Sequence, residues 1–148
     1  MPVEIIDTDL GWEDIFDSII EDNDKEVEVG YYQEDQEDGI GMAELASTHE
    51  FNDRPFMRRS FDNGVKDIFK MQKDLIGSMI DGAIDKRQVM EITGDFHKNQ
   101  IQNGVVQRTL GLKENAQITI DRKGSDTPLI DTSRMINSTQ SNIVKKNG

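Results

Sequence analysis

The sequence predicts an α+β fold, in which a small antiparallel sheet packs against two long helices and shorter N-terminal helices. Two observations lead to this prediction. Apolar residues recur at helical spacing through the middle of the chain, and polar and apolar residues alternate in two short stretches far apart in sequence. The length of 148 residues suits one domain over 1–148, acidic over 1–53, helical over 60–110, and made of a loop and a strand over 111–148.

The first expected element is an amphipathic helix over residues 9–20. Acidic residues lie between its apolar ones, and Asp7, Thr8 or Asp9 can cap its N-terminus, where negative charge is favourable. The apolar residues that define it recur about one helical turn apart: Leu10, Trp12, Ile15, Phe16, Ile19 and Ile20.

Three short elements follow. Alternation over 26–32 predicts a strand with one wet face, and the composition of 33–41 is typical of a solvated acidic loop that two glycines loosen. Residues 42–49 have the spacing of a short helix with one narrow apolar face. Pro55 lacks an N–H, so it either opens a helical turn or lies on a sheet edge.

The clearest helix of the chain begins at Phe61, and its apolar face continues to Ala83. Its opposite face carries the cations Lys66, Lys70 and Lys73. Gly77 and Gly82 each cost this helix about 1 kcal/mol relative to Ala. We therefore expect another part of the chain to pack closely at both glycines.

A second helix, more weakly patterned, is expected over 87–109 and is interrupted by Gly94. The chain changes character after Gly111, where the pattern becomes irregular apart from a brief strand-like run over 118–120. This change indicates that the helical part of the domain ends near that glycine.

The C-terminal segment predicts a loop, a turn and a strand. Residues 127–133 are typical of a tight, specific loop, in which Asp131 or Thr132 can cap a short turn over 134–137. Alternation within 138–146 predicts a last strand.

Charge is divided unevenly along the chain. Residues 1–53 hold 18 acids and one base, Lys25, whereas residues 54–148 hold 11 acids and 16 bases, so net charges of −17 and +5 make up the total of −12. Either the acidic third folds onto the basic remainder, or copies meet acid to base in a ring or stack. A solvated acidic face is the remaining alternative. Such fields guide encounter and exclude wrong partners more than they add affinity.

Composition argues against most kinds of chemical site. The chain has no cysteine, so disulfides, thiolate zinc sites and cysteine nucleophiles are excluded. His49 and Glu50 begin an H-E-x-x-H zinc pattern, but Asp53 stands where the second histidine would be. No phosphate-binding glycine loop and no nucleophile-elbow motif occurs. We therefore expect no catalytic, metal-binding or cofactor-binding residues, and no enzymatic activity.

Membrane insertion, export and DNA binding are also disfavoured. No stretch approaches the roughly 18 apolar residues of a membrane span, and residues 1–10 carry acids where a secretory signal carries positive charge. A protein that grips duplex DNA needs clustered cations to displace counterions, which the overall negative charge opposes.

Four segments are too particular to form a generic surface. The first two are GIGMAELASTHEF over 39–51 and RPFMRRSFD over 54–62, and the others are TIDRKGS over 119–125 and PLIDTSRMINS over 128–138. In this order they resemble the neck and tail-completion proteins of tailed bacteriophages, the minor tail protein Z-like family. Members of that family carry AELAxxHEFG, RPFxRxxFD and a late TIxxKG…PLxDTG pattern.

The resemblance spans residues 8–146, with 27–30 matching a glycine-ended strand and 92–101 loosely matching the second helix. Two departures concern loops. Asn52 stands where the family has a glycine after HEF, and Ser133 replaces the glycine of DTG, so a left-handed backbone at that position would be strained.

The resemblance implies a structural virion protein, assembled in the host cytoplasm, that forms a ring at the neck, completes the tail and joins it to the head. It implies a homo-oligomer with sixfold order. It also implies a portal or head-side connector protein as one neighbour and a tail terminator or tail-tube protein as the other. DNA would pass through the channel without specific binding, and no cofactor and no membrane would be involved.

A ring subunit contacts its neighbour through two different patches. We expect one patch at the turn over 54–59, because cations beside an apolar anchor are typical of interface centres, and the other in the acidic loop of the next copy. Alternatively, Phe56 and Phe61 only fill the core of their own domain. The segment over 123–134 either docks the portal-side or tail-tube partner or clamps the chain internally. The candidate interface residues are Arg54, Pro55, Phe56, Met57, Arg58 and Arg59 in the turn, Glu34, Asp35, Glu37 and Asp38 in the loop, and Lys123, Pro128 and Arg134 in the C-terminal segment.

A competing hypothesis from another class is an acidic inhibitor that mimics DNA by presenting carboxylates at phosphate-like spacing. The charge of −17 over 1–53 favours it. The basic remainder and the matched segments argue against it, since a mimic would need neither.

Overall fold

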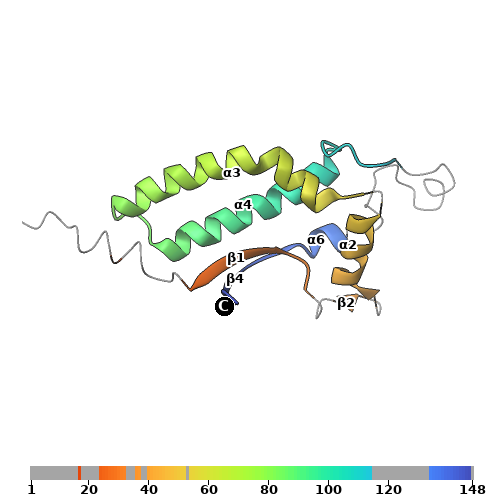
Figure 1. The fold of residues 1–148 in the computed structure, drawn as a ribbon, viewed down its shortest axis with the longest axis horizontal. Helices are drawn as coiled ribbons and strands as arrows, with labels where there is room; N and C mark the ends of the chain where they lie inside the picture. Colours follow the sequence, from red (N-terminus) through yellow and green to blue (C-terminus); the bar gives the residue numbers. More distant parts are fainter. Residues whose placement is uncertain are drawn as a thin grey trace, which may run out of the picture.

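The fold is α+β, as the sequence predicts (Figure 1). A computed structural model describes residues 17, 24–32, 36–37, 40–52, 54–114 and 134–147. Three expected features lie outside these ranges: the run over 118–120, the loop over 127–133 with its candidate caps, and all of the helix over 9–20 except Asp17, which is helical.

Two strands from distant parts of the chain form the sheet. β1 (Lys25–Gly30) pairs antiparallel with β4 (Gln140–Lys145) along its whole length. Val27 and Val29 are half-buried, whereas the two glutamates next to them are exposed. The predicted strand with one wet face is therefore confirmed.

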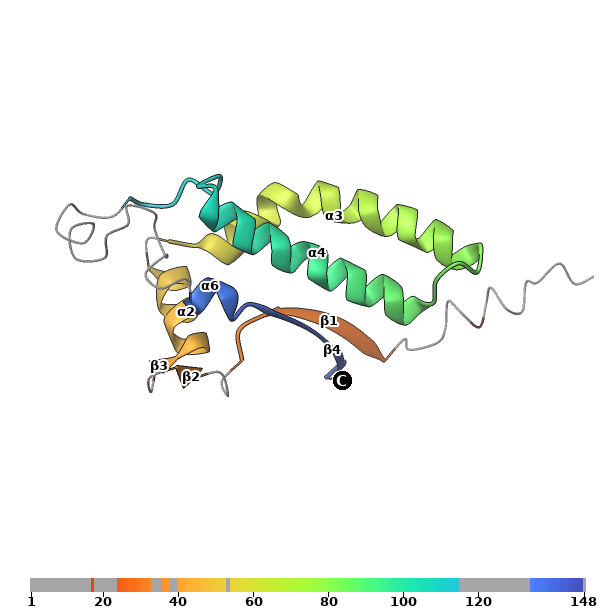
Figure 2. The same ribbon diagram turned by 180° about the vertical axis from the view of Figure 1, so that it is seen from behind.

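Two long helices joined by a short loop make the rest of the body. α3 (Phe56–Ile80) packs along α4 (Lys86–Val106), and α4 separates α3 from the sheet (Figures 1 and 2). The sequence predicts that the first of these two long helices begins at Phe61, but α3 begins at Phe56, more than one helical turn earlier. Pro55 is the N-cap of α3 with φ of −75°, so of its two predicted roles it has the helix-opening one.

The expectation of close packing at Gly77 and Gly82 is wrong. A Cβ placed on Gly77 would meet nothing within 4 Å. Gly82 lies just beyond α3 with φ of +77°, the left-handed conformation that glycine adopts without cost. Its N–H donates to Met79 O at 3.0 Å, and the N–H of Ala83 donates to Ser78 O at 2.9 Å. These two hydrogen bonds form a Schellman motif, so Gly82 ends the helix.

α4 starts at a capping box and passes through Gly94 without interruption. The Asp85 carboxylate accepts the Gln88 N–H at 2.8 Å, and the Gln88 side chain accepts the Asp85 N–H at 2.9 Å. A Cβ on Gly94 would lie 2.8 Å from Val27 Cγ1 and would collide with the Ser141 side chain. The glycine predicted to interrupt the helix is instead the point where the helix contacts both strands.

The core lies where the start of α3 and the end of α4 meet two short helices, α2 (Met42–Phe51) and α6 (Arg134–Asn137). The sequence predicts the first as a helix over 42–49 and the second as a short turn over 134–137, which the structure forms as one turn of helix. The largest fully buried side chains are Phe56, Ile101 and Val105. Around them are the buried side chains of Met42, Ala46, Leu110, Met135 and Ile136.

The acidic loop contains a minimal hairpin that the sequence analysis did not predict. β2 (Gln36–Glu37) pairs antiparallel with β3 (Ile40–Gly41), which leads directly into α2. Over the ranges that the structure describes, none of the helices combines the length and the apolar character needed to cross a membrane.

Candidate assembly surface

The predicted arginine turn, residues 54–59, is organised around one acidic side chain. Glu50, in the last turn of α2, is nearly buried and faces the first turn of α3. Its carboxylate accepts the backbone N–H of Met57 at 2.9 Å and that of Arg58 at 3.2 Å. The first N–H groups of a helix have no partner within the helix, and negative charge is favourable there. Glu50 therefore satisfies the start of α3 and links it to α2.

Arg58 completes this arrangement from the outside. Its Nε donates to Glu50 Oε1 at 2.7 Å, and its Nη2 donates to the Glu50 backbone oxygen at 2.8 Å. The Arg58 side chain is still 65% exposed. One edge of the guanidinium therefore binds inside the molecule, and the rest of the side chain is accessible to a partner.

The two other arginines hold the segment that follows α4. Arg59 Nη1 donates to the backbone oxygens of Leu110, at 3.1 Å, and Gly111. Arg54 Nε donates to the backbone oxygen of Lys113 at 3.1 Å. The arginine turn thus ties residues 110–114 to the start of α3.

Phe56 in the turn and Phe61 shortly after it have different surroundings. Phe56 is 0% exposed and meets the Tyr31 ring edge to face, with centroids 6.1 Å apart, so its role is the alternative one of a core residue. Phe61, for which the same core role was the alternative, is 47% exposed. Its ring contacts the His97 ring of α4 at a centroid distance of 5.6 Å.

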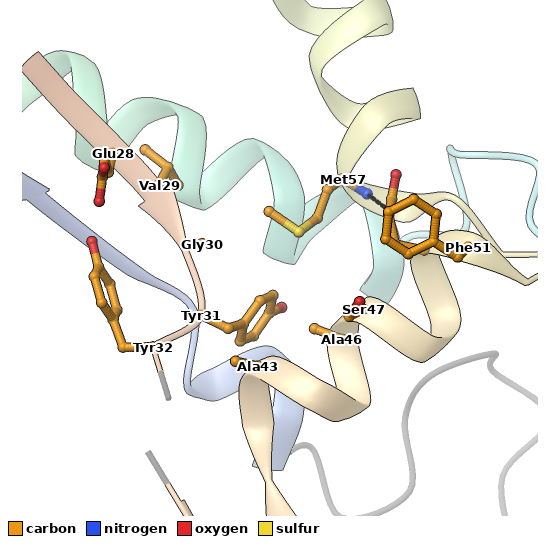
Figure 3. Close-up of a pocket in the computed structure, with 11 residues that line it drawn as sticks. Glu28, Val29, Gly30, Tyr31, Tyr32, Ala43, Ala46, Ser47, Phe51 and Met57 are labelled. Carbon is orange, nitrogen blue, oxygen red and sulfur yellow. Dashed lines mark hydrogen bonds between the residues drawn. The ribbon is translucent and has the colours of Figure 1, made fainter. Parts of the chain in front are cut away.

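An apolar groove with a volume of ≈ 470 Å³ lies beside the arginine turn, between the end of β1, α2 and the start of α3. Figure 3 shows Tyr31 extending from the end of β1 toward α2, with Met57 reaching across from α3. Phe51 also lines the groove and is 81% exposed. Its lining suits an apolar side chain of a partner.

Tyr31 closes the inner side of this groove. Burial raises the pKa of Tyr31 to about 12, and a hydrogen bond with the Thr139 hydroxyl, 2.8 Å away, offsets part of that rise. The same Thr139 hydroxyl lies 2.7 Å from the backbone oxygen of Ile136, so it joins the end of β1 to α6. The phenol is thus held neutral as a structural group.

The other candidate interface residues are only partly described. Glu34, Asp35, Asp38, Lys123 and Pro128 lie outside the described residues. Glu37 belongs to β2, and Arg134 opens α6 with an exposed side chain. The structure therefore brings the residues of the arginine turn together, and the predicted contact of the turn with the acidic loop of another copy stays a prediction.

Sequence reasoning missed two features of this surface. The sequence placed Glu50 only in a failed zinc pattern, because a residue of the preceding helix that accepts the first N–H groups of α3 matches no local capping motif. The backbone oxygens that bind Arg59 and Arg54 lie more than fifty positions further along the chain, and no local pattern could indicate them.

Neither metal ligation nor a known relative identifies the surface. Within the described ranges, no group of three or more His, Cys, Asp and Glu side chains could hold a metal ion. Comparison with family models, with curated proteins and with solved structures finds no match to the chain.

Proposed function

We propose that the chain is a structural virion protein of a tailed bacteriophage, which forms a ring at the neck, completes the tail and joins it to the head. One observation carries the proposal: the segments over 39–51, 54–62, 119–125 and 128–138 resemble those of neck and tail-completion proteins and occur in the same order. The protein acts by assembly, without catalysis and without a cofactor.

The geometry of the arginine turn supports this role. The turn is fixed to α2 by Glu50 and to residues 110–114 by two arginines, so it can meet a partner without a large loss of conformational entropy. The outer part of Arg58, exposed Phe51 and the apolar groove lie side by side on this surface. In the proposed ring the acidic loop of the next copy faces this patch, and the contact repeats around the ring as a heterologous interface.

The proposed partners follow from the same resemblance. Copies of the chain close the ring, which we propose to be a hexamer. A portal or head-side connector protein lies on one side, and a tail terminator or tail-tube protein on the other. Genomic DNA passes through the channel without specific binding.

Electron microscopy of particles made without this protein tests the proposal. We expect filled heads and finished tails that fail to join, and joining in extracts after the purified protein is added. Intact, infectious particles that lack the protein would overturn the proposal, as would a map that places it away from the neck.

A DNA-mimicking inhibitor is the second candidate function, favoured by the net charge of −17 over residues 1–53. A mimic competes with duplex DNA for a DNA-binding protein and acts as a monomer or dimer. Light scattering separates the two candidates, because a neck protein forms rings or adheres to portal and tail components.

A further inference from the structure

The outer side of α3 carries large apolar side chains that stay largely exposed in its own fold. Four large side chains, here called the outer stripe, are 47%, 64%, 45% and 43% exposed: Phe61, Phe69, Ile76 and Ile80. Their spacings of eight, seven and four residues are close to whole numbers of helical turns, so they share one face. An apolar row of this kind on a surface helix indicates a binding surface.

Phe61 reaches α4 through its contact with the His97 ring, and the other three residues of the outer stripe lie beside the face that α3 presents to α4. Ile68 and Met79 are only 6% and 7% exposed, and they belong to the side that packs on α4. At about 100° per residue the outer stripe lies next to this inner face. Of the described elements, α4 packs extensively on α3 and α2 contacts it to a small extent, and Figures 1 and 2 show the far side of α3 uncovered by any other labelled element.

Positive charge borders the outer stripe. Lys66, Lys70 and Lys73 are exposed and follow the stripe on the side turned away from α4. None of them forms an ion pair within the part of the chain that the structure describes. The surface therefore combines an apolar row with a row of cations, and it fits an amphipathic partner of negative charge.

The N-terminal segment over 9–20 has this complementary chemistry. It carries six apolar residues at helical spacing, four acids and no base. Asp17, its one described residue, is helical and exposed. A helix of twelve residues is about 18 Å long, which matches the roughly 17 Å from Phe69 to Ile80 along α3.

We propose that the segment over 9–20 of one copy docks on the outer stripe of a second copy, with its acids beside the three lysines. The connection over 21–24 spans at most about 14 Å. To reach the outer side of α3 in its own copy, the segment would have to pass α4. The axes of two packed helices such as α3 and α4 are about 8–10 Å apart, and the distance from the sheet to α4 comes in addition. Docking on a second copy does not require the connection over 21–24 to span this distance. The contact can repeat from copy to copy as a heterologous interface. This inference goes beyond the proposed function, since it holds for whatever assembly the copies build.

Trp12 provides the measurement, because it is the single tryptophan of the chain and lies in the docking segment. The purified full-length protein is diluted through a concentration series, and tryptophan emission and light scattering are recorded together. We expect emission to shift to shorter wavelength as the protein associates, because the indole leaves water. Emission that stays the same at every concentration would overturn docking on a second copy, whether the indole is buried or exposed.

A stripe variant, Phe69→Ser with Ile76→Ser, identifies the surface. Both side chains are largely exposed, so the fold should be kept, as circular dichroism can verify. We expect association to weaken by at least about ten-fold, because two large apolar side chains lose their burial. The matched control is Val106→Ser, which removes a 55% exposed apolar side chain from α4, and it should associate as the unmodified chain does. Equal association of the stripe variant and the control overturns the proposal.

Mixing two deficient variants tests exchange between copies. The stripe variant keeps Trp12 and lacks the docking surface, whereas Trp12→Ser with Phe16→Ser keeps the surface and lacks the segment. Each alone should associate at least about ten-fold more weakly than the unmodified chain, and their mixture should shift the emission of the single remaining tryptophan. A mixture that shows no shift overturns the proposal. All three measurements use purified protein, so they give the same answer whether or not the protein belongs to a phage neck.

Discussion

The first turn of α3 and its continuation from Phe61 onward both carry aromatic and cationic side chains, but in different surroundings. In its first turn, Phe56 is enclosed in the core, and Arg58 and Arg59 donate to Glu50 and to the backbone after α4. Further along, Phe61 and Phe69 are exposed beside lysines that have no ion pair within the described residues.

The difference shows that a cluster of cations and aromatics does not by itself mark an interface. A cluster at a helix start is surrounded by unsatisfied N–H groups and by neighbouring chain ends, which its own domain can use. A cluster along the middle of a helix that already packs on one side has no such partners. The first part of α3 therefore stabilises the fold, whatever else its exposed side chains contact, whereas the exposed side chains of the second part have no comparable role among the described residues.

Truncation of one phenylalanine from each part should give the largest contrast. Phe56→Ala should lower the free energy of unfolding by about 3–5 kcal/mol, because it leaves a cavity in a fully enclosed site. Phe69→Ala should change it by less than about 0.5 kcal/mol. Urea denaturation followed by circular dichroism measures both, and similar losses for the two variants would refute the contrast.

Gly94→Ala should disturb the face of α4 that packs on the two strands. An added methyl group would lie 2.8 Å from Val27 Cγ1 and would collide with Ser141, so α4 must move away from the sheet. We expect a loss of about 1–3 kcal/mol in the free energy of unfolding. Unchanged stability would mean that the contact between α4 and the strands is looser than the structure has it.

Replacement of the acid that holds the arginine turn should have a smaller effect. Glu50→Gln removes a charge and turns an amide toward N–H donors, so we expect a loss of about 1–2 kcal/mol in the free energy of unfolding. The matched control is Glu91→Gln, whose partner Arg87 lies 3.0 Å away on the surface of α4. It should change stability by less than about 0.5 kcal/mol. Equal effects would mean that Glu50 contributes no more than a surface ion pair.

Alkaline pH should weaken the side of the core that Tyr31 closes. Its pKa is raised to about 12 in the folded protein, from about 10 in the unfolded chain. The stabilising contribution is complete below pH 10 and is lost as the pH rises toward 12, because only the unfolded chain releases the proton in that window. We expect a loss of about 1 kcal/mol per pH unit there, measured by urea denaturation, and a smaller loss in Tyr31→Phe. A profile identical in both chains would assign the loss to other groups.

Local patterns predicted most of the fold and little of the candidate surface. Alternation indicated β1 and β4, and helical spacing indicated α2, α3 and α4, because each of these elements places its apolar residues toward one side. Candidate caps indicated a turn where the structure has α6. The start of α3 was misplaced because Pro55 was treated as ambiguous. The exposure of Phe61 and Phe69 could not be predicted, since helical spacing does not show how wide a face the neighbouring helix covers.

Gly77→Ala tests the exposed side of α3. We expect the smallest change in the free energy of unfolding here, and an increase where Gly94→Ala gives a decrease. Nothing lies within 4 Å of a Cβ at this position, and the residue is in the helix interior, so alanine should raise the free energy of unfolding by about 0.5–1 kcal/mol. The measurement is urea denaturation of the dilute protein, at a concentration where copies do not associate. A glycine that costs stability at an open position is useful if another molecule approaches the backbone there. Gly77 lies on α3 next to Ile76 of the outer stripe, so the association of Gly77→Ala is also compared with that of the unmodified protein. A loss of stability in Gly77→Ala would show that this side of α3 is already covered within one molecule, and the contrast between the two parts of the helix would then fail.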